Sequence, residues 1–419
     1  MQRVRCSFAL TLAFFALMLP AGGADAAGFG IFTQGAAALG QADAVIAHGA
    51  GPSAIFFNPA QLADLTGTRL EIGTTLIAPH REYSSNATGL TTTADQELFF
   101  PSTIYLSQQL NKGVTLGIGA FSPFGLGTRW DDQWEGRYLA TKSRITSYNV
   151  NPVLAVRLTH WLNFAAGIDL LRLDTILEQK ISLASISPVL PDAGQRFRAD
   201  GAGTGYNLGL LAKISKNVSI GISYRSRIKV HLKGDATFTV PDPSLATLFP
   251  NSDGRSSMTL PQQLFAGLAW RASARLTLET GVRWEDWSSF KTLSITLDQP
   301  VAGQTTISQD RNWHGSWAAD LGGRFRLSER VSLLGGYLYS TNAVPDQTFE
   351  PAVPDANTHL FCIGTELSWQ KVQLALSYGF QWQQPRSKHN SVGNATGSAA
   401  NGRYRNDLHL AAVSLGYKF

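Results

Sequence analysis

Residues 372–382, VQLALSYGFQW, carry the pattern that decides the fold. Large apolar side chains occupy every second position, and the residues between them are small or polar. Successive side chains of a strand point to opposite faces of a sheet, so the segment predicts a strand with one apolar and one polar face. The segments 276–284 and 316–327 repeat the alternation. The chain is therefore expected to be built from amphipathic strands.

Alternation fits two kinds of sheet: a soluble sandwich with an apolar core, and a transmembrane barrel with lipid outside and a polar lumen inside. Aromatic residues near the strand ends favour the barrel, and these are Trp270, Trp284, Trp369 and Tyr417. Only 16% of the 419 residues are charged, against about 25% in an ordinary soluble domain. After the N-terminus no apolar run reaches the roughly 18 residues of a spanning helix. The fold class predicted is all-β, a transmembrane antiparallel barrel.

About fourteen strands are expected, an even number as in other bacterial barrels. They are predicted at 68–81, 97–110, 114–123, 140–157, 162–182, 204–215, 218–233, 256–270, 275–295, 311–327, 331–341, 358–369, 372–384 and 403–419. Short turns such as 111–113 alternate with longer connections such as 183–203, 234–255 and 296–310. Short periplasmic turns and long outer loops are typical of outer-membrane barrels, so both strand ends are expected on the periplasmic side.

Residues 1–26 are predicted to be a Sec-type signal peptide. Arg3 and Arg5 precede the apolar run 7–19, and Ala24-Asp25-Ala26 forms an A-x-A cleavage site. An uncleaved anchor is the alternative, but the run is too short to span a bilayer. Cleavage removes Cys6 and leaves Cys362 without a partner, so no internal disulfide is expected.

The next segment, 27–66, is apolar and rich in Gly and Ala, and residues 27–62 contain no Lys or Arg. It follows neither the strand period nor a clean helical one. A barrel much larger than eight strands leaves a lumen that side chains alone do not fill. We therefore expect 27–66 to be a hatch inside the lumen of a barrel formed by 67–419.

Four stretches carry a resemblance to a known family: Ala27-Gly28-Phe29, GAAALG at 35–40, FFNPA at 56–60, and PFGL at 123–126 followed by WDDQWEGRY at 130–138. In this order they resemble the outer-membrane long-chain fatty-acid and hydrocarbon transporters (FadL/TodX-like, OmpP1). The resemblance implies a barrel blocked by an N-terminal hatch. It also implies a ligand-capturing groove among the outer loops and release through a lateral opening in the wall.

Hatch residues follow from this resemblance and from backbone chemistry. Phe29 is expected across the bore, and Asn58-Pro59-Ala60 is expected to form the turn that docks the hatch on the wall. Gly35 and Gly40 permit close backbone approach. Purely structural packing is the alternative role, and for Pro59 the better one.

The loop 124–139 is long, aromatic and of mixed charge. Exposed aromatic residues in a loop usually mark a binding surface, and the resemblance makes this loop a wall of the groove. The predicted groove residues are Phe121, Phe124, Leu126, Trp130, Trp134 and Tyr138. In the alternative, the loop is an ordinary one in which Trp130, Trp134 and Tyr138 pack on each other.

The resemblance further implies cationic lumen residues on the fifth and tenth strands, where this chain has Gln179 and His314. Gln179 shares strand parity with Asp169, and His314 shares it with Asp320, which predicts that both face inward. Neither provides a fixed positive charge at neutral pH. A bulge would bring Lys180 into a carboxylate contact instead, and a water-bonded polar role is the alternative for His314.

The chain is thus predicted to be a passive channel for long-chain fatty acids or similar hydrophobic molecules. The alternative is a transporter of neutral aromatic hydrocarbons; a general porin or a lipid hydrolase fits less well. We find no G-x-S-x-G motif and no metal-binding spacing among the eight histidines, so no enzyme activity, cofactor or metal is expected. The net charge of +5 is spread out, which argues against nucleic acid. Expected partners are the ligand, outer-membrane lipid and, through Phe419, the barrel-assembly machinery; a monomer is expected.

Overall fold

The computed structural model describes residues 28–49 and 51–419. The predicted signal peptide, residues 1–26, lies outside the described residues. Among the described residues, no helix is long and apolar enough to cross a membrane.

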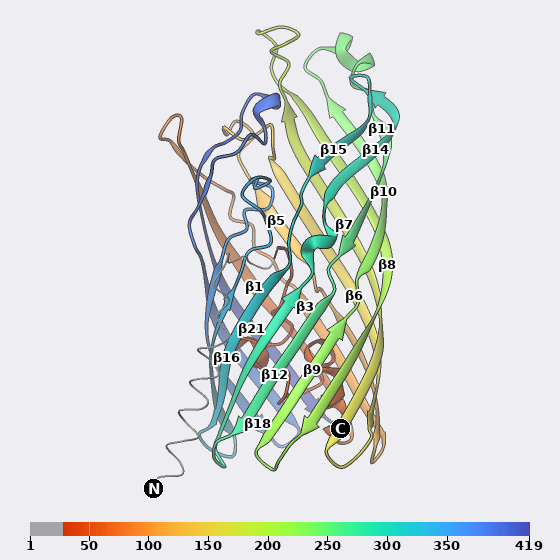
Figure 1. The fold of residues 1–419 in the computed structure, drawn as a ribbon, viewed down its shortest axis with the longest axis vertical. Helices are drawn as coiled ribbons and strands as arrows, with labels where there is room; N and C mark the ends of the chain where they lie inside the picture. Colours follow the sequence, from red (N-terminus) through yellow and green to blue (C-terminus); the bar gives the residue numbers. More distant parts are fainter. Residues whose placement is uncertain (1–27, 50) are drawn as a thin grey trace.

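The wall is a closed antiparallel barrel of fourteen strands, as predicted. It closes where β1 (Thr68–Ser85) pairs with β21 (Gly402–Lys418), in a register that runs from Arg69 opposite Lys418 to Ser85 opposite Gly402. The other wall strands are β3 (Ser102–Asn111), β4 (Val114–Phe121), β6 (Lys142–Arg157), β7 (Leu162–Ile181), β8 (Ala193–Lys213), β9 (Val218–Arg225), β12 (Gln263–Arg271), β13 (Leu276–Glu285), β16 (Ser316–Arg326), β17 (Val331–Ser340), β18 (Thr358–Trp369) and β19 (Val372–Gln383). The strands tilt around a tall cylinder, and the short turns gather at the end where the C-terminus lies (Figure 1).

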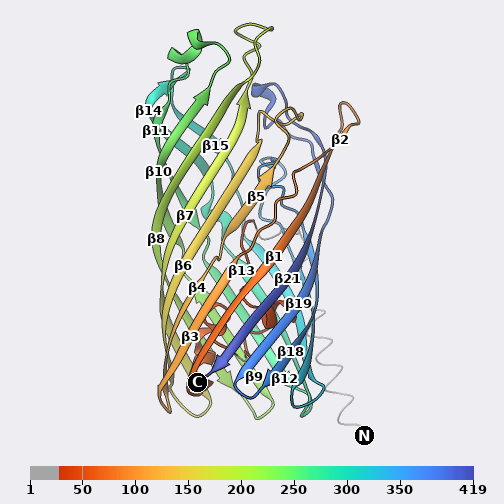
Figure 2. The same ribbon diagram turned by 180° about the vertical axis from the view of Figure 1, so that it is seen from behind.

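Shorter strands extend this wall at the outer end (Figure 2). They are β2 (Thr91–Thr93), β5 (Gly125–Arg129), β10 (Ile228–Thr239), β11 (Ser252–Leu260), β14 (Thr292–Val301), β15 (Gln304–Asp310) and β20 (Arg386–Lys388). Short 3₁₀ turns lie at Pro243–Thr247, Trp287–Ser289 and Asn394–Thr396.

Three predicted loops are therefore too long. Much of 183–203, 234–255 and 296–310 is strand, because β8 begins at Ala193 and β10, β11, β14 and β15 pair with one another above the wall. Three predicted strands are too long as single elements. The predicted strand 218–233 breaks at residues 226–227, between β9 and β10. The predicted strand 256–270 breaks at Pro261, which has no N–H for the ladder, and 275–295 breaks at residues 286–291.

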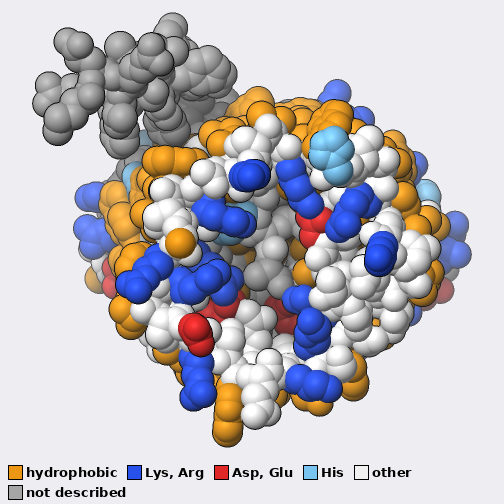
Figure 3. All heavy atoms as spheres, turned by 90° about the horizontal axis from the view of Figure 1, so that it is seen from below, with side chains coloured by type: hydrophobic (Ala, Val, Ile, Leu, Met, Phe, Trp, Pro, Cys, Tyr) orange, Lys and Arg blue, Asp and Glu red, His pale blue; other side chains and the backbone are white. Residues whose placement is uncertain are grey.

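The two faces of the wall differ as the alternation predicts. On β18, Ile363 is 66% exposed, while its neighbour Cys362 is buried on the inner face. Seen from the end with the short turns, hydrophobic side chains form the outer rim and Lys and Arg side chains surround the mouth (Figure 3). Polar groups thus line the opening, and the apolar face is directed outward toward lipid.

Residues 28–66, which we call the plug, lie inside the lower half of the barrel (Figure 2). The plug contains α2 (Ala36–Leu39), α3 (Ala54–Phe57) and a 3₁₀ helix, η1 (Pro59–Asp64). Wall glycines let its backbone come close: a Cβ added at Gly322 would stand 2.3 Å from the carbonyl oxygen of Gln41. The plug is therefore packed directly against the wall backbone.

Candidate ligand-binding site

A cavity of about 820 Å³ lies between the first residues of the plug and the barrel wall. Most of its lining is apolar. Its main apolar side chains are Phe29, Ile77, Phe124, Leu338, Leu360 and Leu410. The volume and the apolar lining are typical of a site for a small hydrophobic molecule.

The cavity also reaches the outer face of the wall. Ile104 and Tyr148 line it, and their side chains, 48% and 58% exposed, lie on the outward faces of β3 and β6. The pairing of β3 with β4 ends at Ile104 opposite Ala120, and among the described residues the β5 ladder has β6 as its only partner. We call the unpaired stretch between residues 96–103 and 121–128 the wall gap.

The wall gap exists because the chain after β4 bends into the lumen and pairs with the plug. Ile31 N donates to Pro123 O at 2.8 Å, and Gly125 N donates to Phe29 O at 2.9 Å. Pro123 has no N–H to offer a neighbouring strand. Ser147 on β6 holds the bend, since its Oγ accepts from Phe124 N at 2.9 Å and donates to Phe124 O at 2.6 Å. The sequence PFG at 123–125 thus interrupts the wall locally.

Phe29 is one aromatic contribution of the plug to the cavity. It is 3% exposed and sits among four aromatic rings, which we call the Phe29 cage. The ring centroids lie 4.6 Å from Phe29 for Trp287, 5.9 Å for Trp313, 6.2 Å for Phe124 and 6.3 Å for Phe290. All four contacts are edge-to-face, the favourable geometry for such pairs.

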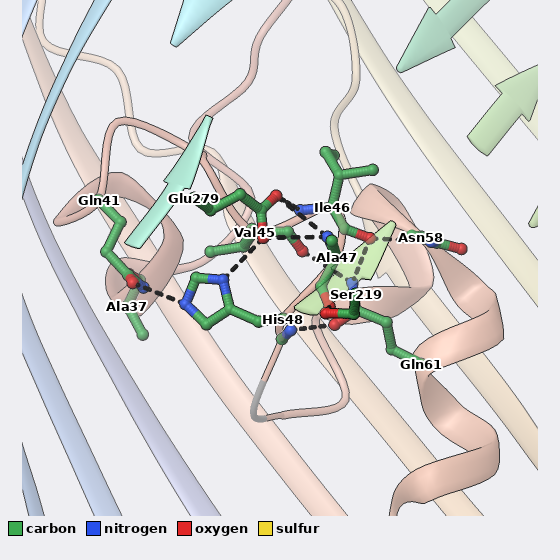
Figure 4. A network of polar contacts seen from close by, with 11 residues as sticks. Ala37, Gln41, Val45, Ile46, Ala47, His48, Asn58, Gln61, Ser219 and Glu279 are labelled. Atoms are coloured by element: carbon green, nitrogen blue, oxygen red, sulfur yellow. Dashed lines mark hydrogen bonds and ion pairs between the residues drawn. The ribbon is translucent and has the colours of Figure 1, made fainter. Parts of the chain in front are cut away.

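The body of the plug is held by polar side chains of the wall (Figure 4). Glu279 on β13 accepts hydrogen bonds from the backbone N–H groups of Ile46 and Ala47, and its Oε2 lies 2.7 Å from His48 Nδ1. Asn58 Nδ2 donates to Ile46 O at 2.8 Å and to Leu210 O on β8 at 2.9 Å. These contacts satisfy backbone groups that would otherwise be buried without partners.

Two buried arginines add further anchors. Arg225 on β9 lies 2.7 Å from Asp169 and donates to Ile55 O of the plug at 2.8 Å. Arg283 on β13 lies 3.3 Å from Asp43 of the plug. Buried ion pairs cost desolvation energy, so they fix the position of the plug more than they add net stability.

Two carboxyl groups line the cavity, Asp43 of the plug and Asp355 of the outer loop 342–357. Burial raises the pKa of Asp43 to about 6, although Arg283 opposes the shift. Burial also raises the pKa of Asp355 to about 6, opposed by the N–H groups of Ala343 and Gly28, which donate to its Oδ2. Both carboxyl groups are thus already engaged by a cation or by backbone donors.

The predicted hatch residues all lie in the plug. Phe29 contacts the cavity, and Asn58-Pro59-Ala60 begins η1, with Asn58 Oδ1 accepting from Ala60 N at 3.1 Å. A Cβ added at Gly40 would stand 2.6 Å from Ser377 Oγ, and one at Gly35 would stand 3.3 Å from Ser53. Gly40 in particular needs the close backbone approach for which glycine was proposed.

The predicted groove residues separate into two groups. Phe121, Phe124 and Leu126 line the cavity. Trp130 and Trp134 do not: their rings stack on each other at 4.5 Å and pack on Tyr83 and Tyr404. Tyr138 is separate again, because its hydroxyl donates to Asp192 at 2.9 Å. For the two tryptophans the structure matches the alternative of ordinary loop packing.

The predicted lumen polar residues are not brought to the cavity. Gln179 Nε2 donates to Gln195 on the next strand at 3.3 Å, and Lys180 Nζ pairs with Asp132 at 2.6 Å. The β7–β8 register is unbroken from Leu162 to Ile181, so no bulge changes the phase at Lys180. The prediction that His314 faces inward by sharing strand parity with Asp320 is wrong, because β16 begins only at Ser316. His314 precedes the strand, and its backbone N–H donates to Ala343 O of an outer loop.

The sequence did not indicate two kinds of residue at this site. Trp287 and Trp313 contact Phe29 without lining the cavity, and both fall in segments predicted as strands. Arg81 lines the cavity from an inward position of β1. The inward parity of Arg81 with Glu71 and Thr75 was available in the sequence. The contacts of Arg81 could not be read from the sequence, because its neighbours Gly127 and Asn406 come from distant parts of the chain.

Similar proteins share both the sequence pattern and the fold. A long-chain fatty acid transport protein of Salmonella typhi is 22% identical over 301 residues, covering 66% of this chain and 68% of the relative. The crystal structure of a Pseudomonas aeruginosa FadL homologue has a TM-score of 0.84 at 19% identity, covering 94% of this chain and 100% of that one. The structure of the Pseudomonas putida toluene transporter TodX has a TM-score of 0.73 at 17% identity, covering 92% and 98%.

A family model described as outer membrane protein transport protein (OMPP1/FadL/TodX) matches residues 17–419, nearly the whole sequence. A barrel wall with an outward apolar face agrees with that description. The chain belongs to this family of outer-membrane transporters of hydrophobic compounds.

Proposed function

We propose that this transporter takes up long-chain fatty acids or similar hydrophobic molecules by passive diffusion and releases them sideways through the wall gap. The observation that carries the proposal is the continuity of one apolar cavity from the Phe29 cage to the outward-facing Ile104 and Tyr148. A ligand in such a cavity would leave into the membrane without crossing the plug.

Along the proposed route, Phe121, Phe124 and Leu126 contribute apolar surface. Each methylene buried there gains about 0.8 kcal/mol. The bilayer offers the tail a similar apolar environment, so lateral release costs little in hydration. An exit through the polar lumen below would expose the tail to water.

The leading segment of the plug, residues 28–33, is proposed to be the part that moves. The wall side chains Glu279 and Arg225 bind residues 46–47 and 55–56, whereas the leading segment is tied by the bridge to 123–125 and by the Phe29 cage. A ligand that competes with Phe29 for apolar contacts would loosen this segment. The body of the plug would stay in place.

A disulfide across the leading segment tests this route. Gly30 and Phe124 are opposite each other in an antiparallel bridge, and the flanking residues make the hydrogen bonds. Such non-hydrogen-bonded pairs have Cα atoms about 4.5 Å apart, within disulfide range. The variant is Gly30→Cys/Phe124→Cys in a Cys362→Ala background, since Cys362 is a free thiol. Oxidation should abolish oleate uptake into proteoliposomes, and reduction should restore it.

A second tether provides the matched control. Gly40→Cys/Ser377→Cys joins the plug body to β19, because a Cβ at position 40 lies 2.6 Å from Ser377 Oγ. Uptake should persist when this tether is closed. If uptake continued with the Gly30–Phe124 disulfide fully formed, the proposed movement of the leading segment would be contradicted.

Neutral aromatic hydrocarbons are the second candidate ligand. Two observations favour them: the apolar lining of the cavity, and the absence of Gln179 and His314 from that lining. One structural neighbour is titled a toluene transporter, while the Salmonella typhi relative is named for fatty acids. Competition binding of oleate against toluene at neutral pH would decide between the two.

A further inference from the structure

The cavity is polar at its outer end and apolar at its inner end. In the β1–β21 ladder, Arg81 pairs with Asn406, Pro79 with Leu408 and Ile77 with Leu410, and all of these except Pro79 line the cavity. Successive inward pairs are about 6.6 Å apart, so the Arg81 guanidinium group belongs to a level roughly 13 Å above Ile77. The apolar level continues inward to Leu338 and Leu360. This gradient fits an amphiphile with its polar head toward the outside.

Arg81 has free donors at this polar end. Its Nη1 donates to Gly127 O across the wall gap at 2.7 Å. Its Nε is buried and has no hydrogen-bond partner, and none is recorded for Nη2 in the described part of the chain. The Nε–Nη2 edge of a guanidinium matches the two oxygens of a carboxylate. An anionic head group would therefore satisfy donors that the protein leaves open.

Among the residues that the structure describes, no carboxylate neutralises Arg81 at close range. Glu97 acts on it electrostatically, but no acidic oxygen of the described residues lies within ion-pair distance. The carboxyl groups of Asp43 and Asp355, which share the cavity, are engaged by Arg283 and by two backbone N–H groups. Arg144, the other cation of the lining, is exposed on the outward face of β6.

A neighbouring amide extends the polar end. Asn406 is buried beside Arg81; its Nδ2 donates to Gln383 at 2.6 Å, while its Oδ1 has no partner. A carboxylate anion has no proton to give to this amide oxygen, so a water that bridges Asn406 Oδ1 and the head group would satisfy both acceptors. Unpaired polar groups in such a place are costly unless a ligand or water meets them.

We propose that Arg81 is the specificity-determining residue for ligands with a carboxylate, holding the head group of a long-chain fatty-acid anion while its tail extends toward the apolar level of Ile77 and Leu410. This inference rests on the proposed function, since it names the ligand class of the same cavity. It moves the carboxylate contact from the fifth and tenth strands, where Gln179 and His314 stand, to β1.

The test compares two probes with the same hydrocarbon tail, oleate and oleyl alcohol, on the purified full-length transporter. Arg81→Gln should weaken oleate binding by about 10- to 100-fold, the usual worth of a charge-assisted hydrogen-bond pair. The affinity for oleyl alcohol should change less than about 2-fold, which also shows that the variant cavity is folded. Arg81→Lys should recover part of the oleate affinity, because it keeps the charge but loses the bidentate geometry.

Arg144→Gln is the matched control, since it removes a cation from the same lining on the outward face. It should leave both probes unaffected. An equal loss of both probes in Arg81→Gln would show a merely structural role across the wall gap and overturn the inference, as would unchanged oleate binding. A wild-type protein that binds neither probe would refute the proposed function itself, a result distinct from both.

Discussion

Single residues tie the plug to parts of the chain that are remote in sequence. Asp355 accepts from Gly28 N at 3.0 Å and from Ala343 N at 3.1 Å, so one carboxyl group joins the leading segment to an outer loop. Burial raises its pKa to about 6, above the ordinary value of 3.8. The contact therefore depends on a carboxyl group that ionises with difficulty.

The stability of the protein should depend on pH through Asp355. Between pH 3.8 and about 6 the native state binds more protons at this group than the unfolded state, so its contribution falls as pH rises through that window. Asp355→Asn cannot ionise. The free energy of unfolding of this variant relative to wild type should therefore rise by about 2 kcal/mol from pH 4 to pH 7. A shift from 3.8 to about 6 is worth roughly 3 kcal/mol in full, and part of this is already lost at pH 4.

Urea unfolding in detergent micelles at the two pH values measures this difference. Asp131→Asn, at an exposed aspartate of the loop 130–139, should show no such pH dependence. A difference between Asp355→Asn and wild type that is the same at pH 4 and pH 7 would contradict the assignment.

At the level of elements, the plug and the wall meet through backbone groups of one and side chains of the other. Residues 46–48 of the plug form no helix or strand, so the N–H groups of Ile46 and Ala47 depend on Glu279 of β13 (Figure 4). Ser219 of β9 donates to Ala47 O at 2.9 Å, so side chains of two wall strands fix a segment that lacks regular structure.

Removing Glu279 should loosen the plug without opening the wall. Glu279→Ala leaves the N–H groups of Ile46 and Ala47 buried without an acceptor, at a cost of about 3–5 kcal/mol. Hydrogen exchange of a peptide covering 44–49 should accelerate, and ion conductance in planar bilayers should rise. Peptides from β17 and β18 should keep their protection. Glu329→Ala, in the exposed turn 328–330, is the control and should change neither readout.

At the scale of the whole molecule, stability depends on matching the apolar outer face to the lipid. Ile363 lies midway along β18, between His359 near the outer end and Trp369 beside a short turn, and points outward. The charged outward positions Lys233 and Asp235 lie on the β10 extension, beyond this apolar band.

A substitution to arginine should therefore destabilise the barrel strongly within the apolar band and only slightly on the β10 extension beyond it. Ile363→Arg is expected to destabilise the barrel by about 2–4 kcal/mol in liposomes, the usual cost near the bilayer midplane. Thr237→Arg, at an exposed position two residues beyond Asp235 on β10, should cost less than about 1 kcal/mol. Equal costs at the two positions would show that the band is not where the structure indicates.

The sequence predicted the barrel because alternation is local. Each wall strand shows an apolar and a polar face in its own sequence, as the neighbours Leu376 and Ser377 do on β19. The short turns are also local, so the number of strands can be estimated without knowing which strands pair. The sequence also predicted which segment enters the lumen, since 27–66 has no strand period and contains no Lys or Arg. Strand limits at the outer end were less predictable, because β10, β11, β14 and β15 form through mutual pairing that no single segment encodes.

The ligand cavity was decided by tertiary structure. Phe29, Trp287 and Trp313 are far apart in the chain and meet only when the plug enters the barrel. The wall gap arises because Pro123 and its neighbours pair with the plug instead of β3. Both possible partners are remote in the sequence, so local patterns do not show which one pairs. Local sequence patterns thus predicted an outer-membrane barrel and the segment that enters its lumen. Closure brought Arg81 beside Gly127 and Asn406, because contacts between remote segments depend on barrel register, which local patterns do not specify.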